Sequence, residues 1–597
     1  MFDYVTIVME KGAIITFMHC FACGRPRTFV SQLLLGLACF ILPSVAPAGS
    51  APDLVYTIST DWDTENRQLI VSLEFIGEDD GTTSIRIPHA WAWQDSYERG
   101  IKNFRALSDW TSVTEKRGEH EYVVHHPPAA EVAIQYVVVQ YWDEPITRDV
   151  YYRPILGSDF FHFIGHGLFV YPDWDLEKTR EIRVTWNNLP ATWNLANSFG
   201  VGDTDQTVQC SLDELCHAVY MGGNIRVHQI DVMGRPVFTS IIGDWQFQVD
   251  DFDTLVGKTV RAVREYWNDF EFPFFLVTMI PTDQPCCSKG GTGLSDSYGL
   301  FVSAETEDLD DLKFLLAHEL FHTWNGRKIQ RQHPEELVYW FAEGFTDYFT
   351  LLILLRSGLI TLQEYIEDVN RTLVNLHESP ARNITNQEIL ERTHKDQIVE
   401  RIPYLRGDLV ALRWDAAIKR VTGGTFSLDN LMKDLLNAAI NSGTLVSSQS
   451  IDSLIRPYLR DGVVDDIQSF IDSGKTVVLS DSDLGPCVSL DTVEISPFDL
   501  GFCYSKPKEG DPWMISGVDP EGPAFAAGLR DGQTLEGRSI HWNQTEKPVV
   551  LQVRNKNGEL KEIKYYPKGK PFPVPQFRLD LNEYKTDSSA CLKWFGL

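Results

Sequence analysis

Positive charge is scarce in this sequence relative to negative charge. The 597 residues include 53 Lys and Arg but 83 Asp and Glu, which gives a formal net charge of −30 at pH 7. Nucleic acids and anionic membrane surfaces repel a chain of this charge. We therefore expect no nucleic-acid partner, and the acidic residues, which are spread along the chain, favour solubility.

Long apolar runs are missing beyond the N-terminus. The nearest candidate, LLILLRSGLI, is interrupted by Arg356 and Gly358. A helix that spans a bilayer needs about 20 predominantly apolar residues. We expect no membrane span.

The N-terminus has the pattern of a secretory signal. Arg25 and Arg27 precede the apolar run FVSQLLLGLACFIL, and the small residues Ala46-Pro47-Ala48 follow it. This order of basic, apolar and small residues predicts a signal peptide over residues 1–48, with Met18 as an alternative start. The mature protein is therefore expected to be exported and soluble, in a periplasm or outside the cell.

Cysteines are few, and none beyond the predicted signal has the CxxC spacing of a zinc ribbon or a thioredoxin-like site. Seven cysteines remain after the signal, which is an odd number. Cys286 and Cys287 are adjacent and are not expected to pair with each other. An oxidising compartment permits two candidate disulfides, Cys210–Cys216 and Cys487–Cys503.

The chain length predicts several domains, and the residue patterns divide it into regions. Alternating runs such as QLIVSLEFIG and EVAIQYVVVQYW predict a β-rich domain, of sandwich type, over residues 49–245. Helical patterns dominate residues 246–478, and short strands with Gly and Pro turns return over residues 479–572. Residues 573–597 form a C-terminal extension. The expected fold class is multidomain α+β.

Helices are expected over several continuous stretches of the middle region, among them DLDDLKFLLAHELFHTWNG, ELVYWFAEGFTDYFTLLILLRSG and YLRGDLVALRWDAAIKRV. Gly326, Gly358 and Gly423 stand at the ends of such stretches, as C-terminal caps do.

The segment FLLAHELFHTWNG places ionisable residues inside an apolar helical run. On a helix, His318 and His322 lie one turn apart on the same face. Two imidazoles in this arrangement can hold one Zn²⁺, and Glu319 between them can reach a water bound to the metal. The HExxH pattern also occurs by chance, so it needs further ligands.

A third ligand follows in VYWFAEGFTDYF, where Glu343 lies in an apolar run. A catalytic zinc site uses three protein ligands and keeps one position open for water. Asp347 lies one turn beyond Glu343, where it can accept the free ring N–H of a ligand histidine. HExxH followed by ExxxD is far more specific than HExxH alone. The competing interpretation is surface charge on two amphipathic helices.

Together, HELFHTWNG, WFAEGFTDYF and YLRGDLVALRWD resemble the glycyl aminopeptidase family of gluzincin zinc metallopeptidases, distant relatives of aminopeptidase N. The resemblance implies an N-terminal β domain, a thermolysin-like catalytic domain and a C-terminal PDZ domain. It implies one Zn²⁺ per chain held by His318, His322 and Glu343, with Glu319 as general base. It also matches Tyr404 to the tyrosine that donates a hydrogen bond to the tetrahedral oxyanion, a role that suits a neutral phenol.

The sequence departs from this family in GGTGLSDSYGLF. Family members that trim N-terminal residues often carry a GGLEH-like segment, whose glutamate binds the α-amine of the substrate. Here Ser295 stands in the place of that glutamate, with Asp296 beside it. Peptide hydrolysis is therefore expected, whereas the choice between exo- and endopeptidase stays open. The segment is still expected to pair with substrate backbone, through Gly290, Gly291, Gly293, Ser295 and Asp296.

The C-terminal stretches SPFDLGFCY and VDPEGPAFAAGLRDGQTL resemble a PDZ domain. The resemblance places Leu500, Gly501 and Phe502 in the carboxylate-binding loop, where backbone N–H groups and a neighbouring sheet edge would receive a peptide C-terminus. The alternative is a module that only packs on the catalytic domain.

The function predicted from these motifs is zinc-dependent hydrolysis of peptides or unfolded protein segments. The alternative is a non-catalytic, PDZ-bearing, peptide-binding or chaperone-like protein with a vestigial peptidase site. A vestigial site should have lost at least one catalytic residue, whereas this set is intact. A purely structural zinc site leaves Glu319 unexplained, because such sites are usually closed by four Cys or His ligands.

Overall fold

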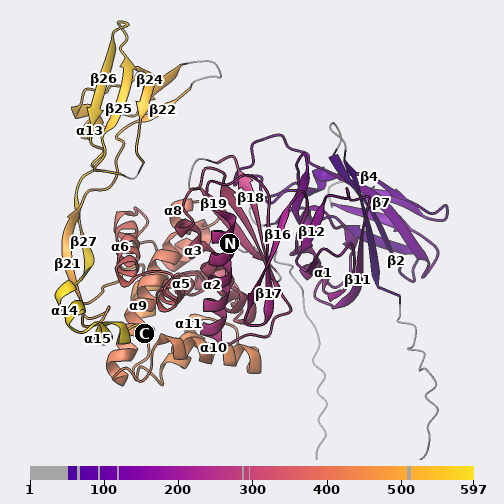
Figure 1. Ribbon diagram of the computed structural model, residues 1–597, viewed down its shortest axis with the longest axis horizontal. Helices are drawn as coiled ribbons and strands as arrows, with labels where there is room; N and C mark the ends of the chain where they lie inside the picture. The colour runs from indigo at the N-terminus through magenta and orange to yellow at the C-terminus, as the bar shows by residue number, and fades with distance from the viewer. Residues whose placement is uncertain are drawn as a thin grey trace, which may run out of the picture.

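The computed structural model describes residues 51–62, 67–91, 94–116, 120–284, 288–294, 296–506, 512–542 and 544–597. The predicted signal peptide, the Cys286-Cys287 pair and Ser295 lie outside the described residues. The expectation of a multidomain chain is confirmed, since β-sheets fill the N-terminal part and helices the middle (Figure 1).

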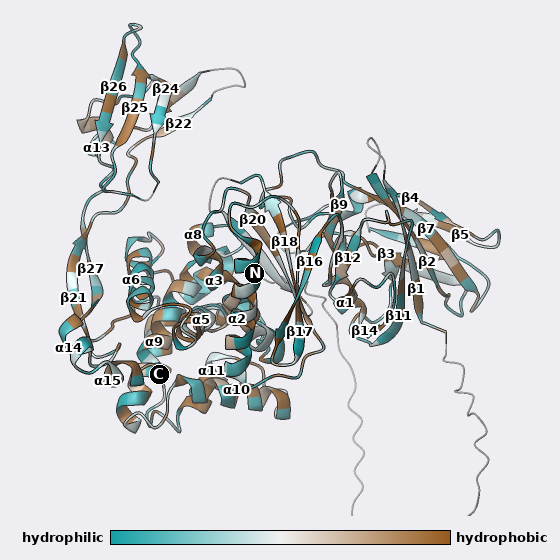
Figure 2. Cartoon of the chain, viewed as in Figure 1, coloured by the Kyte–Doolittle hydropathy of each residue, from teal (hydrophilic) through white to brown (hydrophobic). Residues whose placement is uncertain are grey.

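Three sheets make up the N-terminal part, with strand orders β14-β11-β1-β2-β7-β4, β10-β3-β6-β5 and β13-β12-β15-β9-β8. Alternate residues of strands such as β1 and β7 are buried, and polar and apolar residues mix along these strands (Figure 2). The elements are β1 (Leu54–Trp62), β2 (Arg67–Ile76), β3 (Thr82–Arg86), β4 (Ile101–Ala106), β5 (Ser112–Lys116), β6 (Glu121–His125), β7 (Glu131–Val139), β8 (Ile155–Leu156), β9 (Phe160–Ile164), β10 (Tyr171–Pro172), β11 (Arg180–Asn187), β12 (Asn194–Asn197), β13 (Gly200–Val201), β14 (Asp205–Cys210), α1 (Leu212–Cys216) and β15 (Val219–Gly223).

A fourth sheet, of order β16-β17-β18-β20-β19, adjoins the helices. β17, β18 and β20 are parallel, and β19 runs antiparallel to β20 at the edge. Two of its strands, β16 and β17, precede the predicted domain boundary at residue 245, yet they share this sheet. The bounds are β16 (Arg226–Val232), β17 (Arg235–Ile241), β18 (Phe275–Thr282), β19 (Lys289–Leu294) and β20 (Ser297–Ser303), with the helix α2 (Val249–Trp267) before β18.

The helical part follows the apolar periodicity of the sequence, with two differences. The stretch expected as one helix through Glu343 breaks at that residue, and α3 ends at Phe321, ahead of the wide turn Thr323–Lys328 that contains Gly326. The helices are α3 (Asp310–Phe321), α4 (Tyr339–Ala342), α5 (Gly344–Arg356), α6 (Leu362–Glu378), α7 (Asn386–Arg392), α8 (Gln397–Glu400), α9 (Ile402–Thr422), α10 (Leu428–Ser442), α11 (Ser448–Ile455) and α12 (Val464–Asp466).

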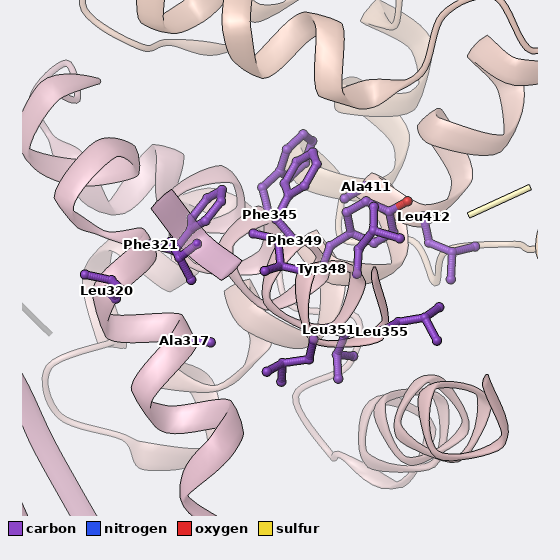
Figure 3. Packing of buried hydrophobic residues seen from close by; sticks show 14 of the residues in the cluster. Ala317, Leu320, Phe321, Phe345, Tyr348, Phe349, Leu351, Leu355, Ala411 and Leu412 are labelled. Atoms are coloured by element: carbon purple, nitrogen blue, oxygen red, sulfur yellow. The ribbon is translucent and has the colours of Figure 1, made fainter. Parts of the chain in front are cut away.

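Helix α5 runs through the centre of the helical core. Phe321 of α3 stacks on Phe349 of α5 with ring centroids 5.7 Å apart, and Leu412 of α9 belongs to the same core (Figure 3). Among the described residues, one helical stretch, Glu335–Arg356, is long and apolar enough to cross a membrane, and 83% of its most apolar window is buried inside the protein. Its apolar character thus serves the packing of α4 and α5.

The C-terminal part stands apart from the helices on a two-stranded ribbon (Figure 1). β21 pairs with β27 along its whole length. The predicted boundary at residue 572 falls at the first residue of β27. Between these strands lies a sheet of order β22-β23-β24-β25-β26 with its own apolar core. The bounds are β21 (Val488–Ile495), β22 (Cys503–Ser505), β23 (Trp513–Ser516), α13 (Pro523–Ala526), β24 (Thr534–Ser539), β25 (Val549–Arg554), β26 (Leu560–Tyr565) and β27 (Phe572–Leu579).

The chain end returns to the helical core through α14 (Leu581–Thr586) and α15 (Ser588–Lys593). Phe595 is 2% exposed and belongs to the core of the helical part. The Arg356 side chain donates from Nε to the Phe595 carbonyl at 2.6 Å. The extension therefore docks on the part of the chain that carries the site described below.

Neither of the two candidate disulfides is present. Cys487 bonds with Cys591, whereas Cys210, Cys216 and Cys503 are free. The physical reason is the ribbon: Cys487 directly precedes β21, and β27 brings the tail back beside it. Cys503 instead begins β22 of the separate sheet.

Candidate active site

Three predicted ligand atoms converge between α3 and the α4–α5 break. The Nε2 atoms of His318 and His322 are 3.1 Å apart, and Glu343 Oε2 lies 3.2 Å from His322 Nε2 and 3.6 Å from His318 Nε2. All three side chains are buried, and their ligand atoms lie within 4.8 Å of one another. The group could hold a metal ion.

Hydrogen bonds on the far side of each ring select the tautomer. His318 Nδ1 lies 2.7 Å from Asp347 Oδ1, and His322 Nδ1 lies 3.0 Å from the Asn325 carbonyl oxygen. Because these oxygens only accept, each Nδ1 carries the proton, and in the neutral rings both Nε2 lone pairs are left for a metal. Two lone pairs facing each other at 3.1 Å repel, and a cation between them removes that repulsion.

The carboxylate supports the same assignment. Glu343 is 5% exposed, and its Oε2 atom has no hydrogen-bond partner among the described residues. Leaving a buried charged oxygen without a partner costs more than the 1–3 kcal/mol or so of a neutral group. Two imidazole nitrogens and one carboxylate oxygen form the donor set of a three-ligand zinc site. The residues present therefore fit a divalent metal.

Asn325 contacts both His322 and residues near Glu343. The sequence pattern did not identify it as a residue of the site. Its carbonyl binds His322, and its side-chain amide donates to the Ala342 carbonyl at 3.2 Å and to Thr346 Oγ1 at 3.1 Å. These contacts fix the turn after α3 against the residues flanking Glu343. The signal that could have found Asn325 is its place three residues after His322, within reach of the ring.

A close helix approach positions Glu343 relative to α9. An ideal Cβ on Gly407 would lie 1.8 Å from the Trp340 carbonyl oxygen, and one on Gly344 would lie 2.3 Å from the Gly407 Cα. Only glycine permits this backbone contact. It brings Tyr404, at the start of α9, to a cavity that Glu343 also lines.

Glu319 and Tyr404 line two different cavities, and each cavity also includes a residue of the ligand group. Glu319 is half-buried and lines a cavity with His322 and Gly293. The Tyr404 ring lies 6.2 Å from the His318 ring. Burial, together with neighbouring carboxylates led by Glu343, raises the pKa of Tyr404 well above its usual value. Its hydroxyl therefore stays protonated and able to donate at neutral pH.

Residues 311–401 match the family model of the M61 glycyl aminopeptidases. The resemblance drawn from the sequence motifs is thereby confirmed for the segment that carries the ligand group. No curated protein sequence matches the chain significantly.

Two solved structures are similar to this chain to different degrees. The crystal structure of an aminopeptidase N family protein from Idiomarina loihiensis is similar with a TM-score of 0.69 at 16% identity, over 91% of this chain and 100% of that chain. An M1 zinc metallopeptidase from Deinococcus radiodurans has a TM-score of 0.46 at 14% identity, over 72% of this chain and 94% of that chain. The first similarity shows an aminopeptidase-like fold over nearly the whole chain.

Strand β19, predicted to pair with substrate, is the edge strand next to Glu319. An ideal Cβ on Gly290 would lie 2.4 Å from Tyr151 Oη, and one on Gly291 would lie 2.0 Å from Tyr298 Oη. Tyr152 Oη donates to the Gly291 carbonyl at 2.9 Å. The glycines thus make room for tyrosines of other strands and loops, which the sequence signalled only through the glycine-rich run.

Asp296 occupies the turn between β19 and β20, with φ 42°. Burial raises the pKa of its carboxyl group, and the positive charges of Arg264 and Arg327 oppose that rise. Asp296 therefore lies in the field of two arginines. Ser295 lies outside the described residues.

The predicted carboxylate-binding loop precedes β22, an edge strand. The Leu500 carbonyl accepts from Tyr565 Oη at 2.6 Å, and the Gly501 N–H donates to Asp499 Oδ1 at 2.8 Å. Phe502 is 7% exposed and belongs to the small C-terminal core. A peptide carboxylate at this loop would have to displace Asp499 from the Gly501 N–H.

Proposed function

We propose that this protein is a zinc metallopeptidase that hydrolyses peptide bonds in peptides or unfolded protein segments. The observation that carries the proposal is the convergence of two Nε2 lone pairs and an unpartnered buried carboxylate oxygen beside Glu319. The M61 match over the same residues supports it. The non-catalytic alternative predicts no turnover from the same metal-loaded protein.

The residues divide the chemistry among them. When bound by His318, His322 and Glu343, a zinc ion supplies Lewis acidity and lowers the pKa of a bound water toward about 7. Glu319 accepts a proton from the attacking water and passes it to the leaving amine nitrogen as the C–N bond breaks. Tyr404 donates from Oη to the carbonyl oxygen as that oxygen gains charge. Asp347 and Asn325 hold the two imidazoles in place throughout.

Purified without chelators, the protein is expected to contain one zinc ion per chain, because the donor set is complete. Elemental analysis measures this, and chelation should abolish hydrolysis of a peptide library while added zinc restores it. Mass spectrometry of library products with free and blocked N-termini identifies the cleaved bonds. A zinc content near zero in both native and zinc-reconstituted samples would end the proposal.

N-acetylation of a good peptide substrate is expected to lower kcat/KM by less than about tenfold, roughly 1.4 kcal/mol. An anion that captures the α-ammonium would contribute more, since a hydrogen bond between charged groups adds roughly 1.5–3 kcal/mol. Ser295 supplies no charge, and Asp296 lies in the field of Arg264 and Arg327.

The control for that experiment is Asp296→Asn, which should leave the ratio between free and acetylated substrates unchanged. A hundredfold loss of kcat/KM on acetylation would instead establish that an anion binds the α-ammonium group and that the enzyme has aminopeptidase specificity. If Asp296→Asn then removed the preference, Asp296 would be that anion.

We also propose that the protein is exported and that residues 479–572 form a PDZ-like module. The basic, apolar and small residues of the first 48 positions support export. The open edge of β22 beside Leu500–Phe502 supports peptide binding by strand addition.

A further inference from the structure

Tyr298 reaches across the sheet to the substrate-facing edge. It lies on β20 directly opposite Gly293 of β19 and is 2% exposed. Its ring belongs to the apolar core on the α3 side of the sheet. The hydroxyl ends at Gly291, where an ideal Cβ would lie 2.0 Å from Tyr298 Oη. Gly291 therefore lets a tyrosine hydroxyl lie where a side chain would otherwise stand.

The apolar packing explains the ring of Tyr298 but not its hydroxyl. No atom of the residues that the structure describes lies in hydrogen-bonding geometry with Tyr298 Oη. Buried hydroxyl groups are nearly always satisfied, because an unsatisfied one loses its bonds to water without replacement. Phenylalanine would keep the ring contacts without that loss. A partner for the hydroxyl is therefore expected.

The space next to Tyr298 identifies that partner. Tyr298 lines a cavity together with Glu319, His322, Arg327 and Gly293. About 10 Å³ of this cavity is open to the centre of a water molecule, and one ordered water needs roughly 10–15 Å³ by that measure. The lining residues include one with a carboxylate, one with a guanidinium group and one with a phenol, and a buried water makes two to four hydrogen bonds to such groups.

We propose that Tyr298 holds one water molecule against the Glu319 carboxylate and thereby orients that carboxylate for proton transfer. The inference rests on the proposed peptidase function, in which Glu319 is the base. Tyr298 is then a positioning residue: it touches neither substrate nor metal and acts through Glu319. Burial, with a smaller contribution from the Glu319 charge, keeps the pKa of Tyr298 well above its usual value. The phenol therefore remains a neutral donor to the water, which in turn donates to the carboxylate.

The test compares Tyr298→Phe with Tyr220→Phe. Tyr220 is also fully buried, its hydroxyl also lacks a partner among the described residues, and it lies in the N-terminal core. Tyr298→Phe is expected to lower kcat by about tenfold, because a misdirected catalytic group loses rate without losing substrate affinity. KM, zinc content and Tm should stay near wild type. Tyr220→Phe should leave kcat unchanged.

Three results would overturn the inference. An unchanged kcat with a raised Tm would show that the Tyr298 hydroxyl has no partner. A raised KM at constant kcat would show that it binds substrate. A lower Tm with loss of zinc would show a purely structural role. Crystal structures of the zinc-loaded wild type and of Tyr298→Phe show whether the water is present, independently of turnover. Water density between Tyr298 Oη and Glu319 that is present in the wild type and missing from Tyr298→Phe supports the inference. Absence of this density from the wild type refutes the inference, even if the protein is not a peptidase.

Discussion

Glu319→Gln is expected to retain one zinc ion per chain and to lose about 10²–10⁴-fold in kcat, the range of general acid–base catalysis. Gln has the shape of Glu but cannot accept the proton of the attacking water. Glu319 lines the cavity between His322 and β19 and supplies no ligand atom to the three-residue group. The measurement pairs steady-state kinetics on a cleaved library peptide with elemental analysis of the same preparation.

The matched control is Glu307→Gln, which removes the same charge from an exposed position ahead of α3. It should hydrolyse the peptide at the wild-type rate. Wild-type turnover by Glu319→Gln would remove Glu319 from the mechanism. Loss of zinc from that variant would instead make it part of the metal site.

Glu343→Ala is expected to abolish both zinc binding and turnover. The substitution removes one of three ligands, and only the two Nε2 atoms of His318 and His322 remain. A metal that binds only the folded protein raises its Tm according to its affinity. Calorimetry with and without added zinc should therefore show a rise in Tm for the wild type and none for Glu343→Ala.

Asp347 provides a graded comparison at the same site. Asp347→Ala should weaken zinc binding by roughly 10–100-fold, the range for partners that orient a ligand histidine. Asp347→Asn keeps an oxygen that accepts from His318 Nδ1 and should lose less. A Glu343→Ala variant that binds zinc as the wild type does would refute the ligand assignment. Equal affinity in Asp347→Ala would show that the 2.7 Å contact with His318 does not orient the ring.

Local periodicity was sufficient to predict most of the helices. Apolar spacing placed α9 correctly, because the buried residues of this helix belong to the core of the helical part. It did not separate α4 from α5 at Glu343, where the apolar run continues without a break. Contacts from other elements surround that position: Gly344 approaches Gly407, and Asn325 binds the Ala342 carbonyl and Thr346. Such contacts leave no trace in the spacing of a single segment.

The sequence by itself determined the chemistry that is available: an imidazole pair one helical turn apart, a carboxylate between them, and a second carboxylate motif in the next apolar run. These are properties of residue type and helical period, so they follow from the order of residues alone. Tertiary structure decided which atoms meet. It set two Nε2 atoms and one carboxylate oxygen within 4.8 Å and paired Cys487 with Cys591 across a sequence separation of 104. Both contacts join different elements of the fold, and their distances depend on how those elements pack.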